Sequence, residues 1–183
     1  MSFRVGKAAL MIVALTPWLA GCMLPGPVGL EAKHQALALV DQGTMLLRQG
    51  DLDQAEAAFR VAYELAGPAA AVDGLGCVAF LKGDLEQAEK YFVQAYQMDE
   101  SYYESLGNLA LLYESQGLYS QAKRVYSLAI QHNPGDYRAR NNFAGLLLDI
   151  KEDAQRARWE LLKARALVDH PLISKNIERV ESP

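Results

Sequence analysis

Clusters of basic residues are missing from this 183-residue chain, and their absence excludes one large class of partner. Lysine and arginine total 18 against 22 aspartates and glutamates, which gives a formal net charge of −4 at pH 7. Proteins that bind nucleic acid need a dense basic patch, because much of their affinity comes from neutralising phosphates. No run of lysine or arginine offers such a patch, so we expect no nucleic-acid partner.

Cysteine is equally scarce, with only Cys22 and Cys77 in the chain. A disulfide framework uses several paired cysteines to stabilise a small, loop-rich, secreted domain. These two cysteines lie in very different sequence contexts, and we expect no internal disulfide. Cys77 has no basic neighbour that would lower its pKa, so we interpret it as a small buried or groove-wall residue.

Recognisable catalytic motifs are also absent. The sequence has no glycine-rich phosphate loop, nucleophile elbow, HExxH or CxxC motif. Its three histidines, His34, His132 and His170, lie far apart, each near the end of an expected helix. A histidine at such a place more often interacts with the helix dipole or free carbonyl groups than with a metal. We therefore expect no enzymatic activity, no metal or other cofactor and no small-molecule substrate.

Apolar residues gather at the N-terminus, in a segment too short to cross a membrane. Arg4 and Lys7 precede an apolar stretch over residues 8–15. A membrane-spanning helix needs about 20 predominantly apolar residues. A short positive region followed by an apolar core and a boundary of small residues is typical of a secretory signal. We predict that residues 1–21 are a cleaved signal peptide.

The end of this segment, Leu19-Ala20-Gly21-Cys22, resembles the lipobox of bacterial lipoproteins. The resemblance implies cleavage before Cys22 and attachment of diacylglycerol and an N-acyl chain, such as palmitate, to that cysteine. Two or more acyl chains would anchor the protein stably in a membrane. The next residue is Met23, whereas an aspartate there retains lipoproteins of enteric bacteria in the inner membrane. By this resemblance we expect a lipid anchor in the bacterial outer membrane, facing the periplasm.

The residues after the expected cleavage site predict a tether between lipid and folded domain. Pro25 and Pro27 lack the amide donor that a helix needs, and Gly26 and Gly29 disfavour helix through their backbone entropy. We therefore interpret residues 22–30 as a lipidated tether.

A pattern of six residues occurs three times in the rest of the chain, beginning at Gly50, Gly83 and Gly117. Each copy ends in an alanine, which is followed after four residues by an aromatic and three residues later by another alanine. A small residue also precedes each glycine at a constant distance. The shared positions are Gly43, Ala55, Phe59 and Ala62; Gly76, Ala88, Phe92 and Ala95; and Ala110, Ala122, Tyr126 and Ala129.

This pattern resembles the tetratricopeptide repeat, a helix–turn–helix unit of about 34 residues. Small residues allow close helix crossing, and the aromatic fills the space between neighbouring helices. The resemblance implies an all-α, right-handed superhelical solenoid over residues 31–170, with units at about 31–66, 69–98, 103–132 and 137–168. A capping helix and tail would occupy residues 171–183, as terminal repeats need a polar outer face. The alternative, a helical bundle with accidental periodicity, does not explain the shared spacing.

The expected fourth unit departs from the pattern at its turn. Lys151-Glu152-Asp153 stands where the other units have their glycine. Ala157 follows its counterpart Ala122 by one residue more than the preceding repeat step. We expect one additional residue in this turn.

The first helices of tetratricopeptide units line a concave groove in which partners bind. Asn108 and Asn142 hold equivalent positions and resemble the asparagines by which some of these domains hold an extended peptide. A carboxamide donates and accepts a hydrogen bond at once, which suits contact with a peptide backbone. The alternative is that both asparagines only bond neighbouring turns. The resemblance places eight residues in the groove: Asp73, Phe80, Glu104, Asn108, Leu111, Arg138, Asn141 and Asn142.

Lipoproteins built from such repeats resemble the members of two known groups of proteins. One group assists assembly of type IV or tight-adherence pili, and the run over residues 139–145 is of a kind common in it. The other group scaffolds peptidoglycan hydrolases. The resemblance therefore implies a membrane-anchored scaffold that holds a partner protein, either a pilus or secretion component or a cell-envelope enzyme.

Overall fold

The computed structural model describes residues 29–181, which form nine helices and no strand. The predicted signal peptide, the predicted acylation site Cys22 and all but the last two residues of the predicted tether lie outside the described residues. Within residues 29–181, none of the helices has both the length and the apolarity needed to cross a membrane.

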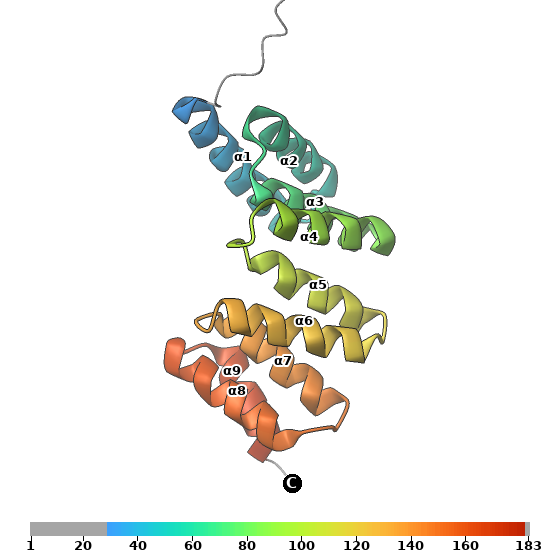
Figure 1. Cartoon of the computed structure of the whole chain (residues 1–183), viewed down its shortest axis with the longest axis vertical. Helices are drawn as coiled ribbons and strands as arrows, with labels where there is room; N and C mark the ends of the chain where they lie inside the picture. Colours follow the sequence, from blue (N-terminus) through green and yellow to red (C-terminus); the bar gives the residue numbers. More distant parts are fainter. Residues whose placement is uncertain (1–28, 182–183) are drawn as a thin grey trace, which may run out of the picture.

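The helices form antiparallel pairs that stack in chain order (Figure 1). The pairs are α1 (Leu30–Gln49) with α2 (Leu52–Ala66), α3 (Ala69–Lys82) with α4 (Leu85–Met98), α5 (Glu104–Ser115) with α6 (Tyr119–His132), and α7 (Tyr137–Asp149) with α8 (Ala154–Leu167). A single helix, α9 (Pro171–Glu181), packs on both α7 and α8 and covers the C-terminal end. The expectation of an all-α solenoid of paired helices with a capping helix is thus confirmed.

The two layers of the solenoid differ in how closely their helices approach each other. Each odd-numbered helix contacts the next odd-numbered one, from α1 to α9. Among the described residues, no two even-numbered helices bring their backbones equally close, and they meet only through side chains such as Tyr96 of α4 and His132 of α6. The odd-numbered layer is therefore the compressed, inner side of the solenoid. This layer makes the concave face, and α2, α4, α6 and α8 make the outer face.

A residue with a left-handed backbone conformation makes the turn between the two helices of each pair. Gly50, Gly83 and Gly117 have φ of 81°, 84° and 73°, a region that glycine enters without a steric penalty. In the fourth pair Lys151 takes this place with φ 52°. The following helix starts after Asp153, whose carboxylate accepts a hydrogen bond from Arg156 N at 2.8 Å. The additional residue expected in this turn is confirmed.

Aromatic rings fill the spaces between neighbouring helices, and glycines on the facing helices leave room for these rings. Phe59 is 1% exposed and lies against both Gly43 of α1 and Gly74 of α3. A Cβ atom on Gly43 would come within 2.7 Å of the Phe59 ring, and one on Gly76 within 2.6 Å of the Phe92 ring. These positions therefore require glycine so that the helices can approach closely. The repeated small and aromatic residues of the sequence are the packing elements of the units.

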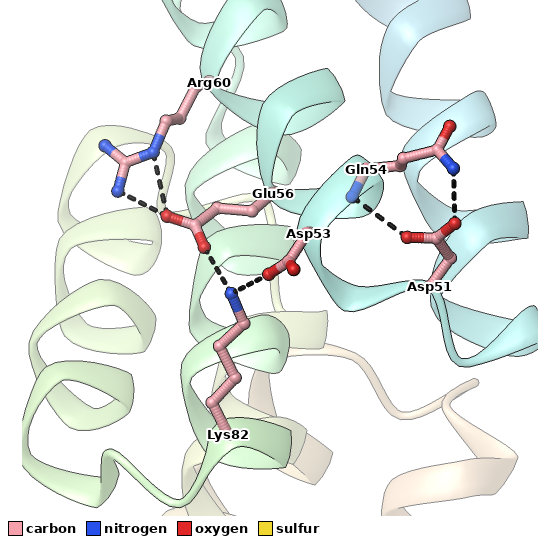
Figure 2. Close-up of polar contacts among 6 residues, drawn as sticks. All are labelled: Asp51, Asp53, Gln54, Glu56, Arg60 and Lys82. Atoms are coloured by element: carbon pink, nitrogen blue, oxygen red, sulfur yellow. Dashed lines mark hydrogen bonds and ion pairs between the residues drawn. The ribbon is translucent and has the colours of Figure 1, made fainter.

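Surface ion pairs join the first two units, between α2 and the end of α3 (Figure 2). Lys82 Nζ, at the end of α3, donates to Asp53 at 2.7 Å and to Glu56 at 2.8 Å. Arg60 Nη2 donates to the same Glu56 at 2.6 Å. Lys82 and then Arg60 lower the pKa of the Glu56 carboxyl below its usual value. Ion pairs this exposed are screened by water, so the interface between units rests mainly on its apolar packing.

A buried ion pair holds the fourth unit together. Arg140 of α7 is 4% exposed and donates to Glu160 of α8, which is 0% exposed. The remaining guanidinium nitrogens of Arg140 donate to Pro134 O at 3.0 and 2.9 Å. Arg156 Nε donates to the other Glu160 oxygen at 2.9 Å. Every charged atom of the pair thereby keeps a partner, as burial of charge requires.

Candidate protein-binding groove

The concave face contains a groove of about 500 Å³ that runs across the inner layer. Helices α1, α3, α5 and α7 each contribute one side chain or more to its wall, as do the loops that precede α5 and α7. Its wall includes Asp73, Cys77, Tyr102, Glu104, Gly107, Asn108, Leu111, Asp136, Tyr137, Arg138 and Asn142.

A buried carboxylate forms the floor of the groove between α3 and α5. Asp73 is 6% exposed, and its two oxygens both accept from Asn108 Nδ2 at 3.0 Å. Tyr102 Oη donates to Asp73 Oδ2 at 3.1 Å. The pKa of the Asp73 carboxyl is raised to about 6. Burial is the largest cause; the hydrogen bonds from Asn108 and Tyr102 lower the pKa, and the charge of Glu104 raises it. Among the described residues, no ion pair neutralises Asp73.

Cys77 lies in the wall beside this carboxylate, with its Sγ atom 3.6 Å from Asn108 Nδ2. Burial, and then the charge of Asp73, raise the pKa of the Cys77 thiol far above its usual value. A thiol that stays protonated is a poor nucleophile and a poor metal ligand. In the part of the chain that the structure describes, no three His, Cys, Asp or Glu residues are grouped so that they could hold a metal ion.

Asparagines recur at one position of three successive helices of the inner layer, and the first two of them line the groove. Asn108, Asn142 and Asn176 follow each other at steps of 34 residues, on α5, α7 and α9. Asn108 is held by Asp73 of the unit before, and Asn176 Nδ2 donates to Asn141 of the unit before at 3.0 Å. The side-chain amides of Asn108 and Asn176 are therefore used for contacts with the neighbouring unit.

The middle asparagine lacks this contact, because the corresponding residue of the unit before is Gly107. Gly107 has no side chain, and a Cβ atom built on it would meet nothing within 4 Å. Asn142 Oδ1 accepts from Asn141 Nδ2 at 3.4 Å, but no described residue accepts a hydrogen bond from Asn142 Nδ2. An available amide donor and open space thus coincide at the centre of the groove.

The structure brings together six of the eight residues that the sequence places in the groove: Asp73, Glu104, Asn108, Leu111, Arg138 and Asn142. It places the other two elsewhere. Phe80 is half-buried and packs against the main hydrophobic core. Asn141 faces the capping helix, where it bonds Asn176, and lines a smaller hollow beside α9.

The groove residues that the sequence did not predict include Tyr102 and Gly107. Tyr102 lies in the loop before α5, where the repeat pattern assigns no role to a side chain. Gly107 could have been found, because it holds the position that Asp73 and Asn141 occupy in their own units. A missing side chain at a repeated position is a signal for open space.

Two of the three histidines, His132 and His170, lie at helix ends and bond nearby groups. His170 Nδ1 accepts from Leu172 N at 3.2 Å and so caps the start of α9. His132 lies in the last turn of α6, with Nε2 3.2 Å from Tyr96 Oη. Both have roles in local structure.

Comparison with known proteins agrees with this architecture. Residues 79–139 match the family model described as tetratricopeptide repeat. The fold is a tetratricopeptide-repeat solenoid. Solenoids of this type bind protein partners and are generally scaffolds without catalytic activity. No curated protein matches the chain in sequence.

Solved structures with this solenoid include three from different contexts. The structure titled Functional Characterization of Pseudomonas aeruginosa pilF has a TM-score of 0.72 and 21% identity, over 82% of this chain and 69% of that one. The Cut9–Hcn1 hetero-tetramer of the APC/C has a TM-score of 0.68 and 19% identity, over 81% of this chain. The chain spans only 30% of that match. MamA has a TM-score of 0.58 and 21% identity, over 75% and 81%. At these identities the similarity shows the fold alone.

Proposed function

We propose that this tetratricopeptide-repeat chain is a membrane-anchored scaffold that holds an extended segment of a partner protein in its concave groove. The observation that carries the proposal is the unused Asn142 amide beside the open space at Gly107. A peptide carbonyl in that space can accept from Asn142 Nδ2. Such a contact recognises the backbone and so tolerates different partner side chains.

A second backbone contact is available one unit away. Asn108 donates to Asp73, but its own Oδ1 accepts no hydrogen bond from a described residue. Neighbouring helices pack about 10 Å apart, which corresponds to roughly three residues of extended chain. An extended segment can therefore donate to Asn108 and accept from Asn142 at once.

Filling the open space tests this site. Gly107→Asp restores the side chain that bonds the next asparagine in the neighbouring unit, so it should occupy Asn142 and obstruct the groove. Loss of one or two backbone hydrogen bonds, each worth about 0.5–1.5 kcal/mol, together with this obstruction should weaken partner binding at least tenfold. Affinity is measured by calorimetry with the partner recovered from detergent-solubilised envelopes.

The matched control is Ser127→Asp, which adds the same charge on exposed, outer-face α6. It should bind as the parent does, and both variants should melt close to the parent. Parent-like affinity of Gly107→Asp with loss of binding in Ser127→Asp would place the partner on the outer face.

The anchor of this scaffold is proposed from the N-terminal sequence. The motif at residues 19–22, after a signal-like segment, supports acylation of Cys22. Fully extended, the following residues would keep the folded domain within about 30 Å of the bilayer. Intact-mass analysis of protein purified from membranes should show a chain that begins at Cys22 and carries lipid, and Cys22→Ala should leave uncleaved precursor. A mature chain that begins elsewhere and has no lipid contradicts the proposal.

We propose that the scaffold assists the assembly of a pilus or secretion machine at the periplasmic side of the outer membrane. The lipoprotein motif, the small number of repeats and the run over residues 139–145 support this assignment. The same partner recovery tests it. A pilus or secretion component is the expected partner, whereas a peptidoglycan hydrolase would assign the chain to cell-wall remodelling.

A further inference from the structure

Negative charge dominates the groove. Asp73, Glu104 and Asp136 line it, whereas Arg138 is the one lysine or arginine among the described residues of its wall. The Asp136 carboxylate accepts from Arg138 N and Ala139 N at 2.9 and 3.0 Å and so caps α7. The uncompensated charge therefore lies at the other end of the groove, with Asp73 and Glu104.

The contacts of Asp73 leave room for a further donor. Its neighbours Asn108 and Tyr102 are neutral, so they stabilise the carboxylate without cancelling its charge. A carboxylate has about four acceptor positions, and one amide nitrogen and one hydroxyl do not fill them all. Taking a carboxylate out of water without a counter-ion is unfavourable, which is also why burial raises the pKa of Asp73 to about 6.

We propose that the groove selects a segment that carries a lysine or arginine, whose cationic head group lies against Asp73 and Glu104. This inference rests on the proposed function of the groove and specifies the chemistry of its occupant. The cation supplies the missing counter-charge, and the buried position of the carboxylate strengthens the interaction.

Arg138 alone does not make the groove suitable for an acidic segment. Its guanidinium lies 5.4 Å from the centre of the Tyr137 ring, at the α7 side of the groove. An acidic side chain could meet this one cation, but along α3 and α5 it would face two carboxylates with like charge. The groove therefore disfavours acidic occupants at the Asp73 end.

Selection from a library of random dodecapeptides displayed on phage tests the inference even before the natural partner is identified. The intact folded chain is the bait, and Gly107→Asn, which fills the gap as Asn141 does in the next unit without adding charge, is the counter-selection that removes peptides bound outside the groove. Groove-dependent peptides should show a basic residue at one fixed position. The same selection on Asp73→Asn should lose this enrichment, and on Glu104→Gln, an exposed position, it should weaken.

Synthetic peptides then measure the contact itself. Replacing the selected lysine with norleucine should weaken binding to the parent by about 10- to 100-fold, the usual range for a hydrogen bond to a charged group. For Asp73→Asn the two peptides should bind nearly equally, because the carboxylate is gone. Asp41→Asn, an exposed aspartate outside the groove, should behave as the parent.

The preference for lysine should also depend on pH. As pH falls from 7.5 to 5 the Asp73 carboxyl takes up a proton, so the parent should lose its preference for the lysine peptide. Glu104, Cys77 and Tyr102 are the other titratable groups around this end of the groove, and Asp136, Tyr137 and Arg138 line its α7 side. They are unchanged in Asp73→Asn, which should show no such loss.

Failure of this inference can be told apart from failure of the proposed function. Groove-dependent peptides without a basic position, or with one that persists in both Asp73→Asn and Glu104→Gln, would overturn the inference and leave the groove function standing. If no peptide depends on the groove at all, both are overturned.

Discussion

Glu160→Gln is expected to destabilise the chain by about 3–5 kcal/mol, a large share of the stability of a domain this size. The substitution keeps the shape of the side chain but leaves Arg140 with a buried charge and no counter-ion. Arg140 is 4% exposed and cannot turn to solvent without opening the contact between α7 and α8. Chemical denaturation of the parent and variant measures the difference.

A surface ion pair provides the control for this prediction. Arg158 and Glu181 join α8 and α9 with both side chains 55% exposed. Glu181→Gln should therefore change the free energy of unfolding by less than about 1 kcal/mol. Replacing the buried pair together, with Arg140→Met and Glu160→Leu, should recover much of the lost stability. Equal effects of Glu160→Gln and Glu181→Gln would show that water reaches the inner pair.

Phe92→Ala is expected to cost a similar amount, about 3–5 kcal/mol, by leaving a cavity between units. Phe92 is 2% exposed, and its ring lies against Gly76 of α3 and within the main core. Thermal and chemical denaturation measure the loss. Tyr63→Ala on α2, which removes an aromatic ring that is 41% exposed, should cost much less.

Gly76, which lies against the Phe92 ring, allows a second test of this packing. In the parent, Gly76→Ala would place a Cβ atom 2.6 Å from the Phe92 ring and should destabilise the chain. In the Phe92→Ala background the same methyl group enters the new cavity, and Gly76→Ala should be neutral or stabilising. Additive effects of the two substitutions would show that the residues do not pack against each other.

The repeat pattern predicted the fold because each of its residues has a local reason to recur. Glycine is favoured where φ is positive, as at Gly83, and is required where a ring leaves no room for a Cβ atom, as at Gly76. Ala88 and Ala122 are 0% exposed at close helix crossings. These constraints act within one unit and its neighbour, so spacing along the chain reveals them.

Other features could not be read from spacing because they depend on side-chain direction between elements. Arg140 and Glu160 are charged residues on two different helices. From sequence alone, charged helix residues are expected to be exposed to solvent. Asn141 and Asn142 are adjacent in sequence, yet one faces α9 and the other the groove. The contact of Tyr102 with Asp73 joins a loop to a helix 29 residues away. Only the packed structure distinguishes these roles.

The central claim is that the concave face, at the gap beside Asn142, holds the partner. A photo-reactive amino acid placed at Leu111, which is 38% exposed on the groove wall, tests it in intact membranes against the same group at Ser127 on the outer face. A discrete cross-linked partner is expected from Leu111 and should disappear in the Gly107→Asp background, whereas Ser127 should give none. A partner cross-linked from Ser127 alone, unaffected by Gly107→Asp, would contradict it.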